Sequence, residues 1–290
     1  MKLSIIIVNY HTKDFLASCL STIYKAPPAY PFELIVVDNA SGDGARKLLS
    51  DKFPKVRIIG NNRNVGFAKA NNQGLSKAKG EYILFLNPDI IPQPEAIDKL
   101  VKFMMQQKDA GCVGGKLLNP DGSLQFSCRR FPTFFNVFSG RRSLLNKLFP
   151  NNRISKSFLL TDLDYNKVQK VDWVMGACIM ARKEVLERMG GFDEDYFLFV
   201  EDVDFCYRLR KANLFTYYLP DAQFFHFRGV STDRFWKKSL KEHNFGMYNF
   251  FVKHYRPIMP LRVILYIGLV FRILSIMGVK LLIKHNRNEI

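Results

Sequence analysis

The sequence is poor in cysteine, and the cysteines that it has form no recognisable pair. No CxxC motif occurs in it. The five cysteines are Cys19, Cys112, Cys128, Cys178 and Cys206. An odd and dispersed set argues against a disulfide framework and against a zinc site. The simplest interpretation is a protein of a reducing compartment.

The beginning of the chain has no recognisable export signal. In MKLSIIIVNYH the apolar run is only about five residues long, and no small-residue cleavage site follows it. We therefore expect a buried strand that starts almost at residue 1, and a folded part that stays in the cytoplasm.

Several common nucleotide-binding and hydrolase motifs are also absent. The chain contains no GxGxxG, GxxxxGK[ST], HExxH or GxSxG. These absences argue against a dinucleotide-binding site, a P-loop and the standard hydrolase sites.

Acidic residues are scarce relative to basic ones. The chain of 290 residues has 26 Asp and Glu against 43 Lys and Arg, which gives a formal net charge of +17. A surplus of this size implies an anionic partner, and nucleic acid, an anionic membrane surface and phosphorylated substrates all qualify. The basic residues are spread through loops and concentrate near the C-terminal apolar segment. This distribution favours a membrane surface and diphosphate groups over nucleic acid.

Long apolar runs are missing even from the most apolar segment, residues 257–283. Arg262, Arg272 and Lys280 interrupt it and leave runs of about nine residues, short of the roughly twenty that span a bilayer. We predict an amphipathic helix in the membrane interface, with its basic residues towards anionic lipid. The alternative is a helical hairpin packed on the rest of the chain or on a second subunit.

The first third of the chain alternates between strand-like and helix-like segments. LSIIIVNY is a continuous β-branched run, typical of a strand buried on both faces. The alternation predicts an α/β fold whose mostly parallel sheet is flanked by helices. The predicted strands are 3–10, 33–38, 56–61 and 81–91, and the predicted helices are 14–24, 66–80 and 94–107.

The middle of the chain is less regular. NPDG at 119–122 predicts a hairpin turn, and residues 139–170 are polar and basic with weak periodicity, so we expect a mobile insertion there. Residues 171–191 predict a strand and then a helix that ends at Gly190 and Gly191.

Polar residues follow two of the predicted strands at their carboxyl ends, where ligands bind in sheets of this kind. Asp38 and Asn39 follow one strand, and Asn87 and Asp89 follow another. Asp38 could bond a base or a ribose, and Asp89 could hold a metal. Asp and Asn also favour turns for local reasons, but two such ends on one sheet favour a site.

FLFVEDVDFCYRLR, residues 197–210, places Glu201, Asp202 and Asp204 among Phe, Leu, Val and Cys. Burying an ionised carboxylate without a partner costs several kcal/mol or more. A dense acidic cluster in apolar surroundings therefore points to a chemical role.

Taken together, these segments resemble a bacterial glycosyltransferase of family 2 with the GT-A fold, and are most similar to its rhamnosyltransferase-like branch. The resemblance covers residues 3–232 and predicts a GT-A domain, 1–232, followed by a helical, amphipathic or membrane-associated segment, 233–290. It rests on SIIIVNYH, LIVVDNASGDG, NRNVGFAKANNQG, YILFLNPDI, VMGACIMARKEVLERMGGFDEDYFLFVEDVDFCYRLR and HFRGVST.

The resemblance implies a nucleotide-sugar site at the carboxyl ends of the strands. Asp38 would bond the base or ribose with Asn39 beside it, and residues 64–74, notably Gly66 and Asn72, would line the nucleotide pocket. NPD stands where the family has its metal-binding DxD, so Asn87 replaces the first acid.

The same resemblance implies a divalent cation, Mg²⁺ or Mn²⁺, which would bridge the diphosphate oxygens. Asp89 would be its principal acidic ligand. His226 would complete the metal shell or touch the diphosphate, although a lone His is often structural. A nitrogen ligand would favour Mn²⁺ somewhat.

The VEDVDF motif would carry the catalytic base. We expect Asp202 in that role, with Glu201 as second choice or supporting partner. Asp204 is expected to be structural, as a helix cap or as the partner of Arg208.

Five further residues match the family's substrate site less specifically. Trp173 and Gly176 would line the donor-sugar and acceptor site, and Trp173 could equally be core. Asp193 would touch the sugar or order a turn. Arg129 and Arg130 would bind a diphosphate or form a solvated basic loop.

The implied function is inverting transfer of a sugar, with dTDP-rhamnose as the expected donor, to a glycan or lipid-linked glycan in cell-envelope polysaccharide biosynthesis. A UDP-sugar donor is the alternative within this fold, and a homo-oligomer is possible. A nucleotidyltransferase is disfavoured because no glycine-rich loop follows the first strand. We expect the enzyme to lie on the cytoplasmic face of the cell membrane, and we do not expect nucleic-acid binding.

Overall fold

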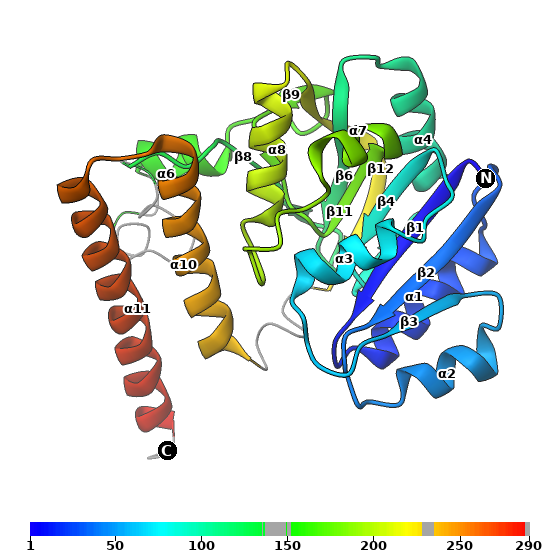
Figure 1. Ribbon diagram of the computed structural model, residues 1–290, viewed down its shortest axis with the longest axis horizontal. Coiled ribbons are helices and arrows are strands. Elements are labelled where there is room, and N and C mark those ends of the chain that lie inside the picture. Colours follow the sequence, from blue (N-terminus) through cyan, green and yellow to red (C-terminus); the bar gives the residue numbers. More distant parts are fainter. Residues whose placement is uncertain (135, 137–148, 150–151, 228–234, 288–290) are drawn as a thin grey trace.

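The computed structural model describes residues 1–134, 136, 149, 152–227 and 235–287, with side chains as far as Gly278. Figure 1 shows a sheet with helices on both faces, and a helical hairpin to one side of it. The predicted boundary at residue 232 and a part of the predicted insertion, 139–148 and 150–151, lie outside the described residues.

The first half of the sheet follows the predicted alternation. The strands β1 (Leu3–Asn9), β2 (Phe32–Asp38), β3 (Arg57–Gly60) and β4 (Tyr82–Leu86) pair in parallel in the order β3-β2-β1-β4. Every residue of β1 is buried, as the continuous apolar run predicts. The helices α1 (Lys13–Lys25), α2 (Ala45–Lys52) and α3 (Phe67–Leu75) connect these strands.

The second half continues the sheet as β11-β6-β12-β5. Strand β11 (Cys178–Arg182) runs antiparallel to β4 and to β6 (Ala110–Leu118), whereas β12 (Phe215–His226) runs parallel to β6. β5 (Ile90–Pro92), β7 (Leu124–Gln125) and β9 (Gln169–Val171) extend its edges, and β7 follows the predicted NPDG turn. A separate small sheet joins β8 (Cys128–Arg129) to β10 (Trp173–Val174).

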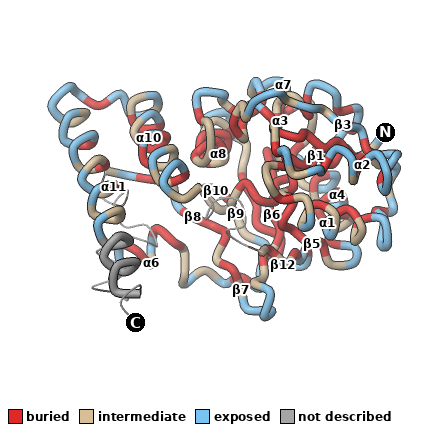
Figure 2. The backbone as a smooth tube through the Cα atoms, turned by 90° about the horizontal axis from the view of Figure 1, so that it is seen from below, coloured by how far each residue is buried: buried red, intermediate tan, exposed pale blue. Residues whose placement is uncertain are grey.

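Successive side chains of the strands point to opposite faces of the sheet, so the sheet has one apolar cluster on each face. Leu3, Ile5 and Ile7 pack with α1, α2 and α4 (Ala96–Gln106). Ile6 packs with α3, α7 (Lys183–Met189) and α8 (Glu201–Lys211). Figure 2 shows the buried residues concentrated in the strands.

The described part of residues 139–170 contradicts the sequence prediction, because it contains a helix as well as the start of β9. Residues Arg153–Leu159 form α6, whose Asn152 accepts an N-cap hydrogen bond from Ser155 N at 2.8 Å. The helix was missed because it has only seven residues, too few to show a periodic pattern.

The C-terminal segment forms an antiparallel hairpin of α10 (Trp236–Tyr255) and α11 (Met259–Arg287) (Figure 1). α10 packs on α8 and on the loop before it, and α11 packs on α10. One apolar cluster joins the three parts: Tyr196, Val200, Val203, Met247, Phe250, Phe251, Leu265 and Leu269. The hairpin therefore shares a core with the sheet domain, as in the alternative interpretation of the tail.

Candidate active site

A cavity of about 580 Å³ opens where the carboxyl ends of β1 and β4 face the beginning of α8 and the hairpin. Its walls come from segments that are far apart in the sequence, which is typical of sites at the end of an α/β sheet. The sequence-predicted residues that line it are Asn39, Asn87, Asp89, Arg129, Trp173, Gly176, Glu201, Asp202 and His226.

Asp38 lies behind the wall of this cavity rather than on it. Its Oδ1 accepts a hydrogen bond from Asn9 Nδ2 at 3.2 Å, and its Oδ2 accepts one from Arg46 Nε at 2.6 Å. The side chain is 5% exposed. A direct bond from Asp38 to a base or ribose would therefore require the Arg46 side chain to move.

Asn39 lines the cavity and organises the loop before α3. Its Oδ1 accepts hydrogen bonds from Val65 N and from Asn61 Nδ2, both at 3.0 Å. Its Nδ2 donates to Asn64 Oδ1 and to Gly66 O. All the amide atoms of Asn39 are thus engaged in shaping the loop, so its role in the structure is to position other residues.

Gly66 and Asn72 fasten α3 to the loop before α8. Gly66 has φ +92°, and a Cβ there would lie 2.6 Å from the carbonyl oxygen of Phe197. Asn72 donates to Phe192 O at 2.8 Å and accepts from Phe192 N at 2.9 Å. Asn72 does not line the cavity, so the structure does not bring it to the predicted nucleotide pocket.

Asn87, Asp89 and His226 form an oxygen- and nitrogen-rich corner of the cavity. The Oδ1 atoms of Asn87 and Asp89 are buried and accept no hydrogen bond from any described residue. His226 Nε2 lies 3.6 Å from Asp89 Oδ1, and Nδ1 of the same ring lies 2.6 Å from Gln125 Oε1. Burial raises the pKa of Asp89 to about 7.

This corner fits a hard divalent cation that takes its remaining ligands from a diphosphate and water. Among the described residues no group of three or more His, Cys, Asp and Glu side chains could hold a metal by itself. Asp89 and His226 supply a carboxylate and an imidazole, and the buried oxygen of Asn87 lies on the same chain turn. Mg²⁺ and Mn²⁺ sites commonly combine few protein ligands with substrate phosphates.

Asp202 faces the cavity at the first turn of α8. Its Oδ2 accepts a hydrogen bond from Gly176 N at 2.7 Å, and its Oδ1 accepts one from Val203 N at 2.8 Å. A Cβ on Gly176 would come within 3.3 Å of Asp202 Oδ2, so the absent side chain permits this approach. The two hydrogen bonds fix the carboxylate and leave lone pairs of both oxygens available to the cavity.

Glu201 and Asp202 differ in the groups that act on their pKa values. Burial raises the pKa of Asp202 to about 6, against the hydrogen bonds from Gly176 and Val203. Burial, reinforced by the charges of Asp202 and Asp204, raises the pKa of Glu201 well above its usual range. Two backbone N–H groups thus favour the ionised form of Asp202, whereas the neighbouring negative charges disfavour ionisation of Glu201, so Asp202 is the better candidate for a base.

The chain reaches α8 through two residues in the left-handed region. Phe199 has φ +67° and Val200 has φ +70°. This conformation is unfavourable for a β-branched residue, by about 1–3 kcal/mol. Val200 also packs against Gly246 of α10, so the hairpin supports the strained turn that presents Glu201 and Asp202.

Asp204 is structural, as the sequence predicts. Its Oδ2 accepts from Arg208 Nε at 2.6 Å, which confirms the predicted pair, and its Oδ1 lies 2.6 Å from His254 Nε2 of α10. Although burial opposes it, these partners hold the pKa of Asp204 below its usual value.

The weaker candidates divide between cavity and surface. Arg129 is buried in the cavity wall, where its Nη1 donates to Cys128 O at 2.6 Å, whereas Arg130 is exposed and outside the wall. Trp173 lines the cavity and donates from Nε1 to Arg130 O at 2.9 Å. Asp193 orders a turn by accepting from Asp195 N at 3.1 Å and pairs with Lys253 of α10; it does not line the cavity.

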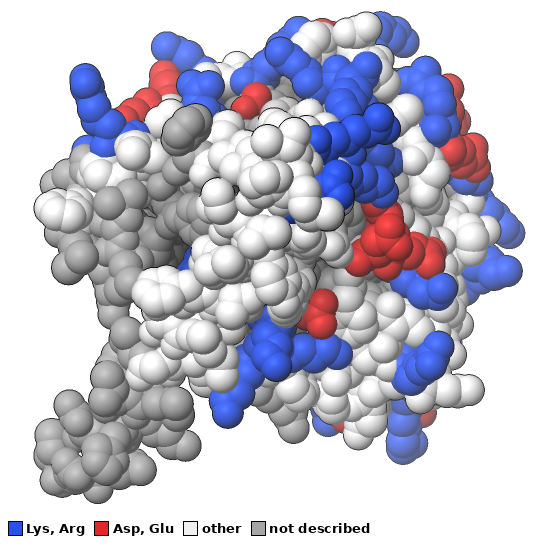
Figure 3. All heavy atoms as spheres, turned by 60° about the vertical axis from the view of Figure 1, so that its left-hand side comes forward, with Lys and Arg blue, Asp and Glu red and all other residues white. Residues whose placement is uncertain are grey.

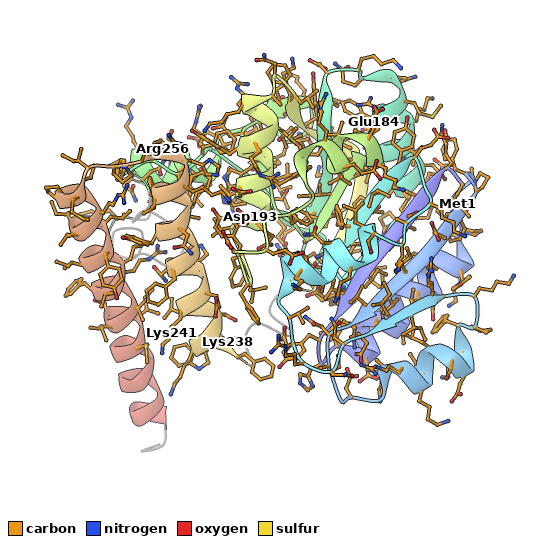
Figure 4. The ribbon with its side chains drawn as sticks, in the orientation of Figure 1. Met1, Glu184, Asp193, Lys238, Lys241 and Arg256 are labelled. Atoms are coloured by element: carbon orange, nitrogen blue, oxygen red, sulfur yellow. The ribbon has the colours of Figure 1, made fainter. Side chains whose placement is uncertain are left out.

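Sequence reasoning missed the contribution of the hairpin to the cavity. Trp236, Lys238, His243, Met247 and Arg272 all belong to its lining. Lys238 lies towards the beginning of α10 (Figure 4), with its Nζ 3.9 Å from the ring centroid of Phe197. Arg272 contradicts the prediction that it faces lipid, because it lies on the inner side of α11.

Comparisons with known proteins agree with this architecture. The family model described as "Glycosyl transferase family 2" matches residues 4–190. The chain is 29% identical over 259 residues to "N-acetylglucosaminyl-diphospho-decaprenol L-rhamnosyltransferase" of Mycobacterium tuberculosis, covering 86% of this chain and 83% of the relative. It is 26% identical over 246 residues to "Rhamnosyltransferase WbbL" of Escherichia coli, covering 82% and 88%.

Two solved structures share the fold. One is "Mannosyltransferase PcManGT from Pyrobaculum calidifontis in complex with GDP-Man and Mn2+", with a TM-score of 0.57 and 20% identity, covering 91% of this chain and 68% of that chain. The other is "Crystal structure of S. aureus TarS 1-349 in complex with UDP", with a TM-score of 0.54 and 19% identity, covering 86% and 66%. At these identities the likeness concerns the fold alone.

Proposed function

Because the chain belongs to glycosyl transferase family 2 and has the GT-A fold, we propose that it transfers rhamnose from dTDP-rhamnose to a lipid-linked glycan, with inversion at the anomeric carbon. The resemblance read from the sequence, including its rhamnosyltransferase-like branch, is confirmed at the level of family and fold. The observation that carries the proposal is Asp202, an ionised carboxylate fixed by Gly176 N on the wall of the cavity.

Asp202 acts as the general base in this proposal. It takes the proton of the acceptor hydroxyl while that oxygen attacks the anomeric carbon from the side opposite the leaving nucleoside diphosphate. The new carbon–oxygen bond forms as the sugar–phosphate bond breaks, and the configuration inverts. The raised pKa of Glu201 favours its neutral form, in which the carboxyl group can donate a hydrogen bond beside the base.

The surrounding residues exclude water and orient the reactants. Phe197, Phe199 and Trp173 border the site of Asp202 with apolar surface, which limits hydrolysis of the donor. Arg129 adds a fixed positive charge in the wall, and this charge lowers the pKa of Asp202. It favours the anionic form of the base and attracts the diphosphate.

We propose that Asp89 and His226, together with Asn87 Oδ1, hold a divalent cation, Mg²⁺ or Mn²⁺. When bound, the cation neutralises the negative charge of the departing diphosphate. His226 is oriented for this role by Gln125, which binds the other ring nitrogen at 2.6 Å.

The choice of donor and acceptor rests on the relatives. Two of them are rhamnosyltransferases by name, and the name of one specifies N-acetylglucosaminyl-diphospho-decaprenol. These names support rhamnose as the sugar and a prenyl-diphosphate-linked acceptor in cell-envelope polysaccharide biosynthesis. UDP-sugars remain the alternative donors to be tested beside dTDP-rhamnose.

We propose that the enzyme works on the cytoplasmic face of the membrane, with α11 lying in the interface. Among the described helices, only α11 has a stretch long and apolar enough to cross a membrane by length and composition, Met259–Gly278. One face of α11 packs on α10, and a span would draw Lys241, Lys253 and other polar groups of α10 into hydrocarbon. On the hairpin side of the molecule, Figure 3 shows an area of uncharged residues, and Lys and Arg outnumber Asp and Glu along its described edges.

Release of nucleoside diphosphate and transfer of sugar test this function. The protein would be incubated with Mn²⁺ or Mg²⁺, a panel of nucleotide-sugars and N-acetylglucosaminyl-diphospho-prenol, beside Asp202→Asn. Asp51→Asn, an exposed carboxylate on α2, is the matched control. We expect metal-dependent transfer from dTDP-rhamnose that Asp202→Asn loses and Asp51→Asn keeps. Transfer that persists in Asp202→Asn would refute the assignment of the base, and silence with every donor would refute the proposed reaction.

A further inference from the structure

The two faces of α11 are unlike each other. Ile264, Ile267, Phe271 and Leu274 are 61–67% exposed and recur at spacings of three and four residues. They therefore form one outward stripe of large apolar side chains. A stripe of this kind suits the acyl region of a membrane surface.

Between Leu265 and Ile276, the inward stripe of the same helix contains one charged residue. Leu265, Leu269, Arg272 and Ile276 follow one another at spacings of four, three and four residues, so they share a face. Leu265 and Leu269 are buried against α10, while Arg272 and Ile276 line the cavity. The helix thus carries an arginine at a position where its own pattern calls for an apolar residue.

The surroundings of Arg272 are those of a binding group rather than of a solvated surface charge. Burial lowers the pKa of Arg272, and the guanidinium belongs to the wall of the cavity that also contains Asp202. Lys238 of α10 lines the same cavity. Arg272 and Lys238 therefore bring a guanidinium and an ammonium group to one cavity, where they favour an anionic group of a substrate.

We propose that Arg272 binds the diphosphate group of the lipid-linked acceptor. This inference rests on the proposed function and adds to it the residue that receives the acceptor. Guanidinium groups bind phosphate oxygens through two parallel hydrogen bonds, which gives both affinity and orientation.

The position of Arg272 favours the diphosphate of the acceptor over that of the donor. The groups suited to the donor diphosphate, Asp89 and His226, lie at the end of the sheet. Arg272 instead comes from the helix whose opposite face is apolar and exposed. A prenyl chain can stay in the membrane beside the outward stripe while its diphosphate enters the cavity next to Arg272. The acceptor sugar then points towards Asp202.

Paired acceptors separate this role from a general effect on the fold. Transfer would be measured to N-acetylglucosaminyl-diphospho-farnesol and to an alkyl N-acetylglucosaminide that lacks the diphosphate. Arg272→Gln is expected to raise KM for the diphosphate acceptor by about 10- to 100-fold, the range of a charge-assisted hydrogen bond. KM for dTDP-rhamnose and the rate with the alkyl acceptor should change less than about twofold, and Arg272→Lys should recover part of the loss.

Arg262→Gln is the matched control. Arg262 is on the same helix, where its Nε donates to Pro257 O at 2.8 Å, and it does not line the cavity. Arg262→Gln should leave KM for the diphosphate acceptor and the rate with the alkyl acceptor unchanged. Sedimentation with vesicles that contain anionic lipid would be measured for the same proteins, and Arg272→Gln should bind as wild type does.

Four results would overturn the inference. The first is a rise in KM for the donor instead of the acceptor, which would assign Arg272 to the donor diphosphate. The second is an equal loss with both acceptors, and the third is a loss of vesicle binding that accounts for the change. The fourth is an unchanged KM in a variant that melts like wild type. A wild-type protein that transfers nothing to the diphosphate acceptor would instead refute the proposed function, and the inference with it.

Discussion

Lowering the pH from 7 to 5 is expected to remove most of the transferase activity, because Asp202 must be ionised to accept a proton. Its pKa is raised to about 6, chiefly by burial. A group with that pKa is roughly 90% ionised at pH 7 and roughly 10% ionised at pH 5. Since the base form is the deprotonated one, kcat/KM should fall by roughly tenfold over this interval.

The assay must separate Asp202 from Asp89, whose pKa is raised to about 7. Saturating Mn²⁺ does this, because a bound cation keeps its carboxylate ligand deprotonated. kcat/KM for the donor would then be measured from pH 5 to 8 for wild type, Asp202→Asn and Glu201→Gln. Asp202→Asn should be slower by about 10²- to 10⁴-fold and should lack the acidic limb.

Glu201→Gln should keep the acidic limb, because in this proposal the limb reports the ionisation of Asp202, whose pKa is raised to about 6. A flat profile of wild type between pH 5 and 7 would refute the reasoning. So would an acidic limb that survives in Asp202→Asn and disappears in Glu201→Gln, since that pair of results would make Glu201 the base.

Three further predictions concern the supports of the site. In thermal melts, Gly66→Ala should lower the free energy of unfolding by about 1–3 kcal/mol more than Gly122→Ala does. Both glycines have positive φ, but only a Cβ at Gly66 would clash with backbone. Equal losses in the two variants would contradict this. His254→Phe should destabilise by about 1–3 kcal/mol at pH 7 by removing a partner of buried Asp204. Because the pKa of Asp204 is lowered in the folded protein, its ionised form stabilises the fold at pH values above the pKa of Asp in the unfolded chain. The difference in stability between His254→Phe and wild type should therefore shrink as the pH falls below about 4. A difference that stays constant with pH would contradict this. Asp89→Asn should raise the Mn²⁺ concentration for half-maximal activity at least tenfold, and an unchanged metal titration would remove Asp89 from the metal site.

The sequence supports the fold prediction most strongly where local pattern and tertiary environment agree. β1 contains the continuous apolar run IIIV because it is buried on both faces, and this run is visible without a structure. By contrast, α6 is too short for its pattern to be read, and only its capping Asn152 gives a local signal. The antiparallel insertion of β11 depends on long-range pairing that no local pattern carries.

For the site residues, the sequence shows which side chains have the right chemistry, but not where the fold places them. Asp38 and Asn72 have the right chemistry for binding, yet the structure uses them to hold Arg46 and the Phe192 backbone. Asp202 and its neighbours could be found from the sequence, because acidic residues in apolar surroundings require a compensating role. The contact between Asp202 and Gly176 could not be found from the sequence, because the two residues meet only through the packing of α8 against β10.

The inward position of Arg272 is visible in the sequence when the tail is placed on a helix. Counting uninterrupted apolar runs treats every charge in the tail as equivalent, and therefore places Arg262, Arg272 and Lys280 together on the lipid side. Reading the tail at helical spacing instead assigns Arg272 to the stripe of Leu265 and Leu269, opposite the stripe of Phe271. Since the buried stripe faces α10, a charge within it must meet either the protein interior or a bound ligand. The periodicity therefore predicts an inward arginine, and only the cavity beside α8 identifies the substrate group that it can meet.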